Sequence, residues 1–264
     1  QREERASAHQ PRVVIARQTG NINIDGRLSE DAWKEAALIT GFLTLRRNHY
    51  ASRQPSVYLT YGEKCLTIAT VSPLYEGRPP VSNADERDAE VWRDDCIELH
   101  LDPTPTTADY YQLVLNCRGT IFDNYCNPHN RVGKKDVQWN LSDIEVGTRV
   151  DDEHWVLELA VPYAGLGLSR MPHNEQWLFN VCENRRGLDP LSICAVQSFH
   201  ERERFGVLHF VRNAPCIRMH SLGPLKRGRA AFDISYGGEA AGPVQLRIAG
   251  KRYDATADTY FQLF

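Results

Sequence analysis

The sequence predicts an all-β protein: a jelly-roll-like sandwich of two antiparallel sheets, with one short N-terminal helix and part of a second β-segment. Most of residues 56–211 alternates apolar and polar side chains with a period of two, the spacing that places neighbours on opposite faces of a strand. Clusters of Gly and Pro separate these stretches. The alternation of strands and helices that would indicate a parallel sheet does not occur in the sequence. Together these observations favour a sandwich.

Strands are predicted where the alternation is clearest. Residues 56–61 and 66–71 flank Gly62-Glu63-Lys64 as a hairpin. Residues 96–102 place three apolar side chains on one face and Glu98 on the other, which predicts a half-buried strand. The remaining predicted strands cover residues 110–116, 155–161, 177–183 and 207–211.

A short helix is predicted before the first of these strands. Ser29 can cap the segment Glu30–Ala37, whose first turn carries acidic residues, where the helix dipole favours negative charge. We expect Trp33 on this helix to pack against the sandwich, because a large indole is stabilised by burial.

The chain is predicted to have three parts: an N-terminal tail (1–11), the sandwich (12–212) and the start of a second, truncated β-domain (213–264). Net charge over the whole chain is −3, yet from Arg212 onward basic residues outnumber acidic ones eight to four. This shift in charge indicates a boundary. Further strands are predicted at 231–236, 244–248 and 259–264.

Composition excludes several classes of partner. With 31 basic and 34 acidic residues, no overall positive field attracts a phosphate backbone, so nucleic acid is not expected. No run of 18 apolar residues suggests a membrane-spanning helix. The N-terminus lacks the apolar stretch of a signal peptide, so the chain was either never targeted or has lost its signal. Seven Cys leave at least one thiol unpaired within the chain, and the pairing of Cys96 and Cys117 stays open.

The most informative segment places a large aromatic residue immediately before a strand. Trp92 is followed six residues later by Glu98, and Gln112 and Asn116 are predicted on the same face of the next strand. Sugars are bound by this combination, because an indole packs on the C–H face of a pyranose while carboxylates and amides bond its hydroxyls. The alternative is that Trp92 is a core residue at the entrance of a strand.

Six blocks of sequence, taken in order, extend this interpretation. They are Asp25-Gly26 with Asp31-Ala32-Trp33; Arg87-Asp88 with Val91-Trp92-Arg93-Asp94-Asp95-Cys96-Ile97-Glu98-Leu99; Asn116-x-x-Gly119; Trp155-Val156-Leu157-Glu158; Trp177-x-Phe179-Asn180 with Arg185; and Phe199-His200-Glu201-Arg202-Glu203-Arg204-Phe205-Gly206. Over residues 12–212 this order resembles family 9 carbohydrate-binding modules. The resemblance implies a β-sandwich attached to secreted glycan-degrading enzymes, a terminal sugar held between two Trp rings, and calcium sites that support the fold.

By this resemblance, Trp92 matches one wall of the aromatic clamp and Glu98 matches the carboxylate that bonds the sugar. No Trp occurs in residues 191–198, where the second wall is expected. Either Phe199 substitutes for it, or the site is a one-sided platform, or binding has been lost. Further polar contributors are expected at Asn180, Arg185 and Gln197.

An acidic cluster near Trp92 offers a second kind of site. Asp88, Asp94 and Asp95 supply hard oxygen ligands of the type that Ca²⁺ prefers, although their spacing is not that of an EF-hand loop. We expect either a structural calcium ion here or solvated turn carboxylates. No other cofactor is required.

Catalytic and metal-dependent alternatives find less support. Adjacent Asp94 and Asp95 point to opposite faces, which does not suit a glycosidase pair. Gly-x-Ser-x-Gly is absent, and Cys126 with His129 supplies only two zinc ligands. The two Met residues lie on no inward strand position that would suit haem.

The sequence therefore predicts a non-catalytic module that binds a terminal sugar or a short oligosaccharide. The alternative is a structural or spacer sandwich of a larger secreted protein, without a ligand of its own. By the resemblance, the expected location is extracellular or periplasmic, and a catalytic domain in the same polypeptide is the expected partner.

Overall fold

The computed structural model describes residues 10–75, 78–105, 109–127 and 139–212, and four strands beyond them. The chain divides into two compact units, Gln1–Ala214 and Pro215–Phe264. Among the described residues, no helix has the length and apolar character needed to cross a membrane.

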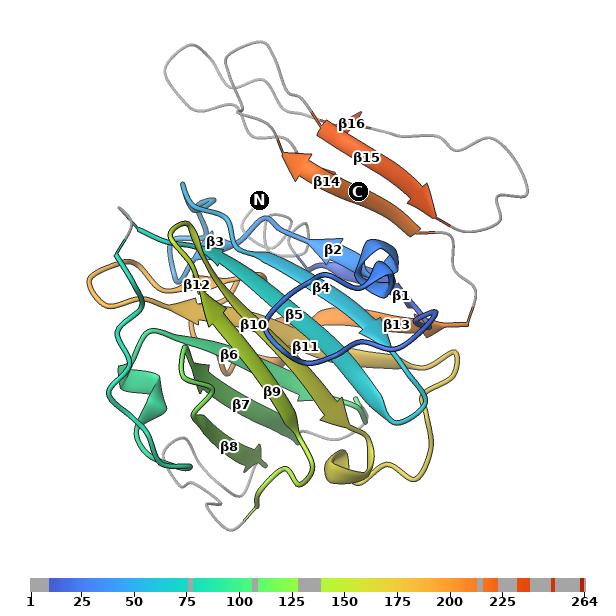
Figure 1. Ribbon diagram of the computed structural model, residues 1–264, viewed down its shortest axis with the longest axis horizontal. Helices are drawn as coiled ribbons and strands as arrows, with labels where there is room; N and C mark the ends of the chain where they lie inside the picture. Colours follow the sequence, from blue (N-terminus) through green and yellow to red (C-terminus); the bar gives the residue numbers. More distant parts are fainter. Residues whose placement is uncertain are drawn as a thin grey trace. The chain divides into compact units, whose positions relative to one another are not determined.

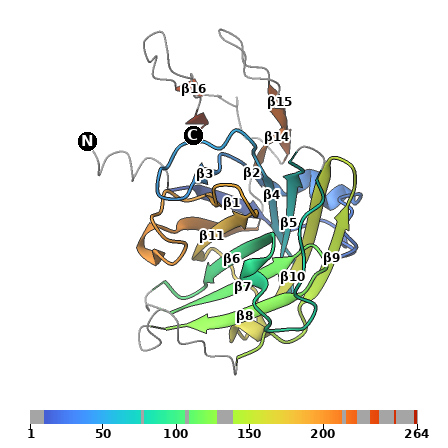
Figure 2. The ribbon, with the colours of Figure 1, turned by 90° about the vertical axis from the view of Figure 1, so that its left-hand side faces the viewer.

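The first unit is a sandwich of two sheets (Figures 1 and 2). The larger sheet has the strand order β1-β13-β11-β6-β7-β8, with β12 pairing β11 and β3. Its strands are β1 (Arg12–Ala16), β3 (Leu43–Thr44), β6 (Cys96–Asp102), β7 (Tyr110–Asn116), β8 (Ile121–Cys126), β11 (Gln176–Asn184), β12 (Leu191–Ser192) and β13 (Gly206–Val211). The smaller sheet has the order β2-β4-β5-β10-β9. Its strands are β2 (Ala37–Ile39), β4 (Ser56–Tyr61), β5 (Cys65–Pro73), β9 (Glu145–Val150) and β10 (His154–Pro162).

The predicted all-β sandwich is confirmed, with one departure from its antiparallel pairing. Strand β1 runs parallel to β13, with Val13 opposite Leu208. A parallel pair needs a long connection, and here the whole sandwich lies between the two strands. The short strands β1, β3 and β12 carry too few alternating residues for the sequence pattern to detect them.

The hydrophobic core lies between the two sheets, as the alternation predicts. The larger sheet contributes the inward side chains of 97, 99 and 101, and of 177, 179 and 181; the smaller sheet contributes Trp155, Leu157 and Leu159. Trp155 and Trp177 are among the largest fully buried side chains. Burial of each such side chain stabilises the fold by about 1.5–3 kcal/mol, so this double layer accounts for much of the driving force.

The outer face of the smaller sheet is also covered. Trp33 on the 3-10 helix η1 (Asp31–Glu35) is 3% exposed and packs on Ala69 and Tyr58. The predicted contact of Trp33 with the sandwich is therefore confirmed. The predicted helix over Glu30–Ala37 is wrong in extent, and Ser29 does not cap it, since the N-cap is Glu30 and no side chain bonds there. The helix ends early because Ala37 is already part of β2, where it pairs with Leu59 of β4.

A buried carboxylate fixes the N-terminal segment on this outer face. Glu158 is fully buried, and its Oε2 accepts the backbone N–H groups of Asp25 (2.9 Å) and Gly26 (2.7 Å). The turn approaches so closely that a Cβ at Gly147 would lie 2.6 Å from the Asp25 nitrogen. Gly26 itself has φ +82°, the left-handed region in which glycine is favoured. The Asp25-Gly26 block is thus a docking turn.

The second unit contains β14 (Cys216–Leu222) paired antiparallel with β15 (Phe232–Gly237), and β16 (Ile248–Ala249) paired with β17 (Gln262–Leu263). The strands predicted at 231–236 and 259–264 overlap β15 and β17. Residues 244–247 of the third predicted strand lie outside the described residues.

We predict that Gly147→Ala destabilises the sandwich by about 1–3 kcal/mol, because the added methyl group would force the docking turn away from Glu158. Urea unfolding of the purified wild type and variant measures the change in free energy of unfolding. Gly62→Ala is the matched control, since its added methyl group would meet only the Gln18 side chain at 3.4 Å. Equal stability of the two variants would contradict the assigned role of the turn.

Candidate functional site

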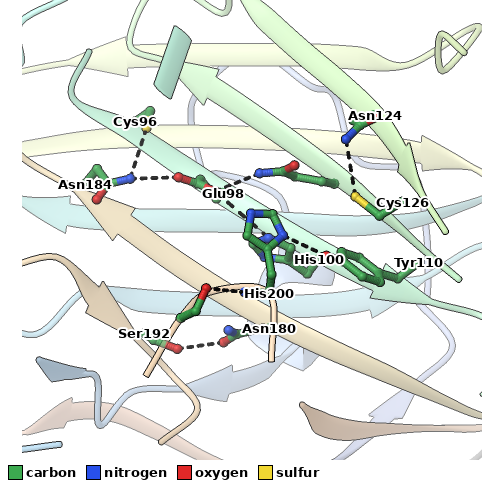
Figure 3. A network of polar contacts seen from close by, with 12 residues as sticks. Cys96, Glu98, His100, Tyr110, Asn124, Cys126, Asn180, Asn184, Ser192 and His200 are labelled. Carbon is green, nitrogen blue, oxygen red and sulfur yellow. Dashed lines mark hydrogen bonds and ion pairs between the residues drawn. The ribbon is translucent and has the colours of Figure 1, made fainter. Parts of the chain in front are cut away.

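Polar side chains line the face of the larger sheet that points away from the core. The register places Asn184, Cys96 and Asn116 in one row across β11, β6 and β7, and Cys182, Glu98 and Val114 in the next. A third row contains Asn180, His100, Gln112 and Asn124. We call this set of three rows the polar face (Figure 3).

The polar face is buried, which corrects the prediction that residues 96–102 form a half-buried strand. Every residue of β6 is buried, including Glu98 at 4% and His100 at 0% exposure. Two segments cover the face. Residues 81–95 pack on it at the Cys96 end, and residues 198–205 contact it at the Asp102 end. A period of two identifies which side chains share a face but not whether a distant segment covers that face.

Glu98 is the centre of the hydrogen bonding. Its two oxygens accept the side-chain N–H groups of Gln112 (3.0 Å) and Asn184 (2.7 Å), from the strands on either side (Figure 3). Burial raises the pKa of Glu98 to about 7, and the two amide hydrogen bonds oppose this rise only in part. The carboxyl group therefore changes protonation near neutral pH.

His100 lies beside Glu98 on the same strand, with 4.0 Å between its Nε2 and the Glu98 Oε2. Burial, and secondarily the charge of His200, holds the pKa of His100 well below its usual value, so the ring is neutral. Neither ring nitrogen has a hydrogen-bond partner among the described residues. The ring contacts His200, Tyr110 and Phe205, with centroids 5.4–5.9 Å away.

The segment over the Asp102 end is held by polar contacts. Arg202 Nε donates to the buried carboxylate of Asp102 at 2.7 Å. Tyr110 Oη lies 2.7 Å from His200 Nδ1, and the His200 side chain lies at the surface (Figure 3). Ser192 Oγ donates to Asn180 Oδ1 at 2.9 Å. These bonds place an aromatic ring, His200, over the polar face.

Trp92 lies on the opposite border of the polar face, in the 3-10 helix η2 (Val91–Arg93). It is partly buried, and its ring meets Phe122 edge to face with centroids 4.9 Å apart. Beneath it, Val91, Cys96, Val114 and Phe122 form a small apolar cluster. The sequence left open whether Trp92 is a core or a binding residue, and the structure places it between these extremes, packed on one side and accessible on another.

Asp94 and Asp95 bind backbone N–H groups of the covering segment. The Asp94 oxygens accept N–H groups of Asn83 and Ala84, each at 2.9 Å, and the Asn116 amide at 3.0 Å. Asp95 accepts N–H groups of Val81 (2.9 Å) and Arg186 (2.6 Å). Asn116 also donates to Ala84 O. These side chains therefore fix the position of Trp92.

The calcium prediction stays a prediction. Among residues 10–75, 78–105, 109–127 and 139–212, no group of three or more His, Cys, Asp or Glu side chains is arranged to hold a metal ion. Asp88 adopts φ +63°, and its Oδ1 is buried without a hydrogen-bond partner. A single such oxygen is not a site for Ca²⁺, which takes six to eight ligands.

Three predicted site residues lie away from Glu98. Arg185 Nε donates to Glu183 at 3.0 Å, and its guanidinium lies 5.3 Å from the ring of Trp155, a core residue. Gln197 is exposed and donates to Arg46 O. Phe199 is buried in the main core, which removes it as a second stacking wall. The other five predicted ligand-binding residues, Trp92, Glu98, Gln112, Asn116 and Asn180, lie on or beside the polar face.

Sequence reasoning missed several residues of the polar face. Asn184, Tyr110 and His200 all lie in or against it. His100, which the alternation does place on the face of Glu98, is not among the predicted ligand-binding residues. Continuing the alternation of Asn180 and Cys182 by one further period of two residues would have found Asn184. His200 carries no local signal, because its place depends on the path of a loop across three strands.

Comparison with known proteins identifies a family for part of the chain. The family model described as carbohydrate-binding family 9 matches residues 77–175. The predicted resemblance is confirmed. Within the matched residues lie Trp92, Glu98, Gln112 and Asn116, whereas Asn180, Asn184 and His200 lie beyond them. No curated protein sequence matches the chain.

Solved structures share the fold at low sequence identity. A carbohydrate-binding candidate from Bacteroides uniformis ATCC 8492 has a TM-score of 0.63 and 14% identity, covering 76% of this chain and 99% of that one. A family 9 module from Caldicellulosiruptor kristjanssonii in complex with cellotriose has a TM-score of 0.53 and 14% identity over 77% of this chain and 95% of that one. A family 9 module from the same organism in complex with glucose has a TM-score of 0.55 and 13% identity, covering 81% of this chain and 100% of that one.

We predict that Glu98 makes the stability of the sandwich fall as pH rises. The folded state holds this proton up to a pKa of about 7, whereas the unfolded state releases it near the ordinary glutamate pKa of 4.5. The stabilisation present below pH 4.5 is thus lost between pH 4.5 and 7, with an upper limit of about 3 kcal/mol. Glu98→Gln, which cannot ionise, should gain stability relative to the wild type over this range.

Chemical denaturation at pH 5, 6, 7 and 8 measures the difference in free energy of unfolding between Glu98→Gln and the wild type. Glu153→Gln is the control, because the Glu153 side chain is 83% exposed. If Glu98→Gln and the wild type show parallel pH dependence, Glu98 does not retain its proton in the folded state.

Proposed function

We propose that this protein is a non-catalytic carbohydrate-binding module that recognises a terminal sugar or a short oligosaccharide. The observation that carries the proposal is the position of Trp92, a partly exposed indole fixed at the border of a buried carboxylate–amide network. The family 9 match contains both Trp92 and Glu98. Structures of the same fold include family 9 modules in complex with cellotriose and with glucose, which supports a sugar as the ligand.

The chemistry of the two groups fits a sugar. The indole offers an apolar surface for the C–H face of a pyranose, and its ring packs against Phe122 at an interplanar angle of 75°. Gln112 and Asn184 each donate a side-chain N–H to Glu98 and retain a carbonyl oxygen that can accept from a hydroxyl group. A preformed network lowers the entropic cost of binding, because the polar side chains are ordered before the ligand arrives.

A catalytic function finds no support in this arrangement. Glycoside hydrolysis needs two carboxyl groups across the scissile bond, one of them free to act as a nucleophile or base. Asp94 and Asp95, the carboxylates nearest Glu98 in sequence, are engaged by backbone N–H groups of residues 81–84 and 186.

The second candidate function is a structural or spacer sandwich. The burial of Glu98 and His100 favours it, because only a small part of these side chains reaches the surface. The absence of a second Trp beside the polar face favours it too. In either case we propose an extracellular or periplasmic location and a catalytic domain in the same polypeptide, both from the family resemblance, and a calcium ion as a further element to be tested with EDTA.

We predict that Trp92→Ala weakens sugar binding about tenfold or more, since it removes the stacking surface but leaves Glu98 and its partners in place. Isothermal titration calorimetry with glucose, cellotriose and a panel of other mono- and disaccharides, with and without EDTA, measures the affinity. Trp139→Ala is the matched control, because Trp139 is a partly buried indole that packs on Tyr111 at the core.

Two results would favour the spacer function instead. One is the absence of a saturable signal with every sugar at millimolar concentration. The other is equal affinity in the Trp92→Ala variant and the wild type. An equal loss in both Trp variants would show that stability, not stacking, sets the affinity.

A further inference from the structure

Three arginines gather near the ends of β5 and β11 around a single aromatic ring and a single carboxylate. The guanidinium carbons of Arg53 and Arg78 lie 5.4 and 5.1 Å from the centroid of the Tyr75 ring. Arg185 pairs with Glu183. We call Arg53, Arg78, Arg185, Tyr75 and Glu183 the arginine cluster.

Arg185 is the most buried member. Its side chain is 9% exposed, and the guanidinium lies over the ring of Trp155 at 5.3 Å. Nε donates to Glu183, whose side chain is 7% exposed. Nη2, by contrast, is buried and has no hydrogen-bond partner among the described residues. A guanidinium carries five N–H donors, so this orientation leaves donors without acceptors inside the protein.

Arg53 also carries a buried N–H donor without an acceptor among the described residues. It is half-buried, and its Nη2 is also buried without a hydrogen-bond partner in the described part of the chain. Burial lowers the pKa of Arg53, and the positive charge of Arg185 lowers it further, while Glu183 acts in the opposite direction. The two guanidinium groups thus repel each other across a single shared counter-charge.

The charges in the cluster do not balance. Among the described residues, Glu183 is the one carboxylate within 4.0 Å of any of the three guanidinium groups. Leaving buried donors and a buried charge without partners is costly, and such groups in folded proteins are normally paired. Within the described part of the chain, the cluster therefore offers more buried N–H donors than acceptors.

We propose that Arg53 and Arg185 bind an oxyanion, a carboxylate or sulfate group, with Arg78 and Tyr75 at the border of the site. A planar carboxylate accepts two parallel N–H bonds from a guanidinium fork, which would engage the Nη2 donors that now have no partner. Neither the family match nor the comparison with solved structures assigns such a site.

The position of the cluster suggests where the oxyanion comes from. Asn184 bonds Glu98 on the polar face, and the next residue in the chain is Arg185. An acidic sugar, such as a uronic acid, would carry its own carboxylate, whereas a free inorganic anion would bind without a sugar. The two sources share the same recognition chemistry, and the experiment separates them. The inference does not depend on the proposed sugar-binding function.

The test uses sulfate, glucuronate and glucose as probes of the whole chain at constant ionic strength, adjusted with NaCl. A ligand that binds the folded state raises the melting temperature in a saturable manner. We expect sulfate or glucuronate to raise the melting temperature through this site, and we expect no such effect of glucose at this site. Arg53→Gln and Arg185→Gln should each weaken the anion response about tenfold or more, as seen in calorimetric titration.

Controls keep this test independent of the sugar site. Arg170→Gln removes an exposed arginine that pairs with Glu175, so it should leave anion affinity unchanged. Trp92→Ala should leave the sulfate response unchanged even if it abolishes sugar binding. If Arg185→Gln does not fold, the half-buried Arg53 still provides the test.

Each outcome is decisive. Binding of sulfate alone identifies a free inorganic anion as the ligand class, and tighter binding of glucuronate than of sulfate identifies an acidic sugar. The proposal is overturned if neither anion shifts the melting temperature beyond the NaCl control. It is also overturned if Arg53→Gln and Arg170→Gln behave alike.

Discussion

The burial of a polar strand face is the constraint on which the rest of this structure depends. Glu98, His100, Asn116 and Asn180 are each at most 4% exposed, so any hydrogen bonds of their side chains come from neighbouring residues rather than from bulk water. The satisfied groups are fixed: Glu98 by two amides, and Asn116 by bonds to Asp94, Ala84 and the turn after β7. The buried network therefore determines where the covering segments lie.

The covering segment 81–95 illustrates how this constraint positions the candidate site. Its two ends are anchored by Asp94 and Asp95 through backbone N–H groups, and its middle by Arg87, which donates to the buried Asp123 at 2.5 Å. Trp92 lies between these anchors. Because the segment has no long helix or strand of its own, the carboxylates supply the order that a regular element would otherwise give. The acidic residues that suggest a metal site in the sequence thus act as acceptors for the loop that carries the indole.

Much of the fold follows from the sequence, because alternation over a long strand reports directly on which side chains meet the core. The strands 96–102 and 110–116 were predicted residue for residue, and the core positions of Trp155 and Trp177 follow from the same rule. Short strands such as β3 and β12 contain two residues each and carry no period. The site is less accessible to prediction. Alternation places Glu98 and Gln112 on one face, but the positions of Asn184 and His200 depend on register and on the path of a loop. The burial of Phe199 does not follow from the sequence, because a buried and an exposed aromatic residue have the same sequence signature.

The end of β11 shows how one strand can contribute to two different polar environments. Consecutive residues of a strand point to opposite faces, so Asn184 joins the carboxylate–amide network while Glu183 lies on the core side with Arg185 beside it. On one side, Glu98 has both oxygens occupied and neutral amides around it. On the other, Arg185 pairs with Glu183, and the Nη2 groups of Arg53 and Arg185 have no acceptor among the described residues. This difference is why we propose a neutral polyol as the ligand of the first environment and an anion as the ligand of the second. Because the two sets lie on opposite faces of the sheet, each environment is set by its own partners, and the backbone of residues 183–185 is what connects them.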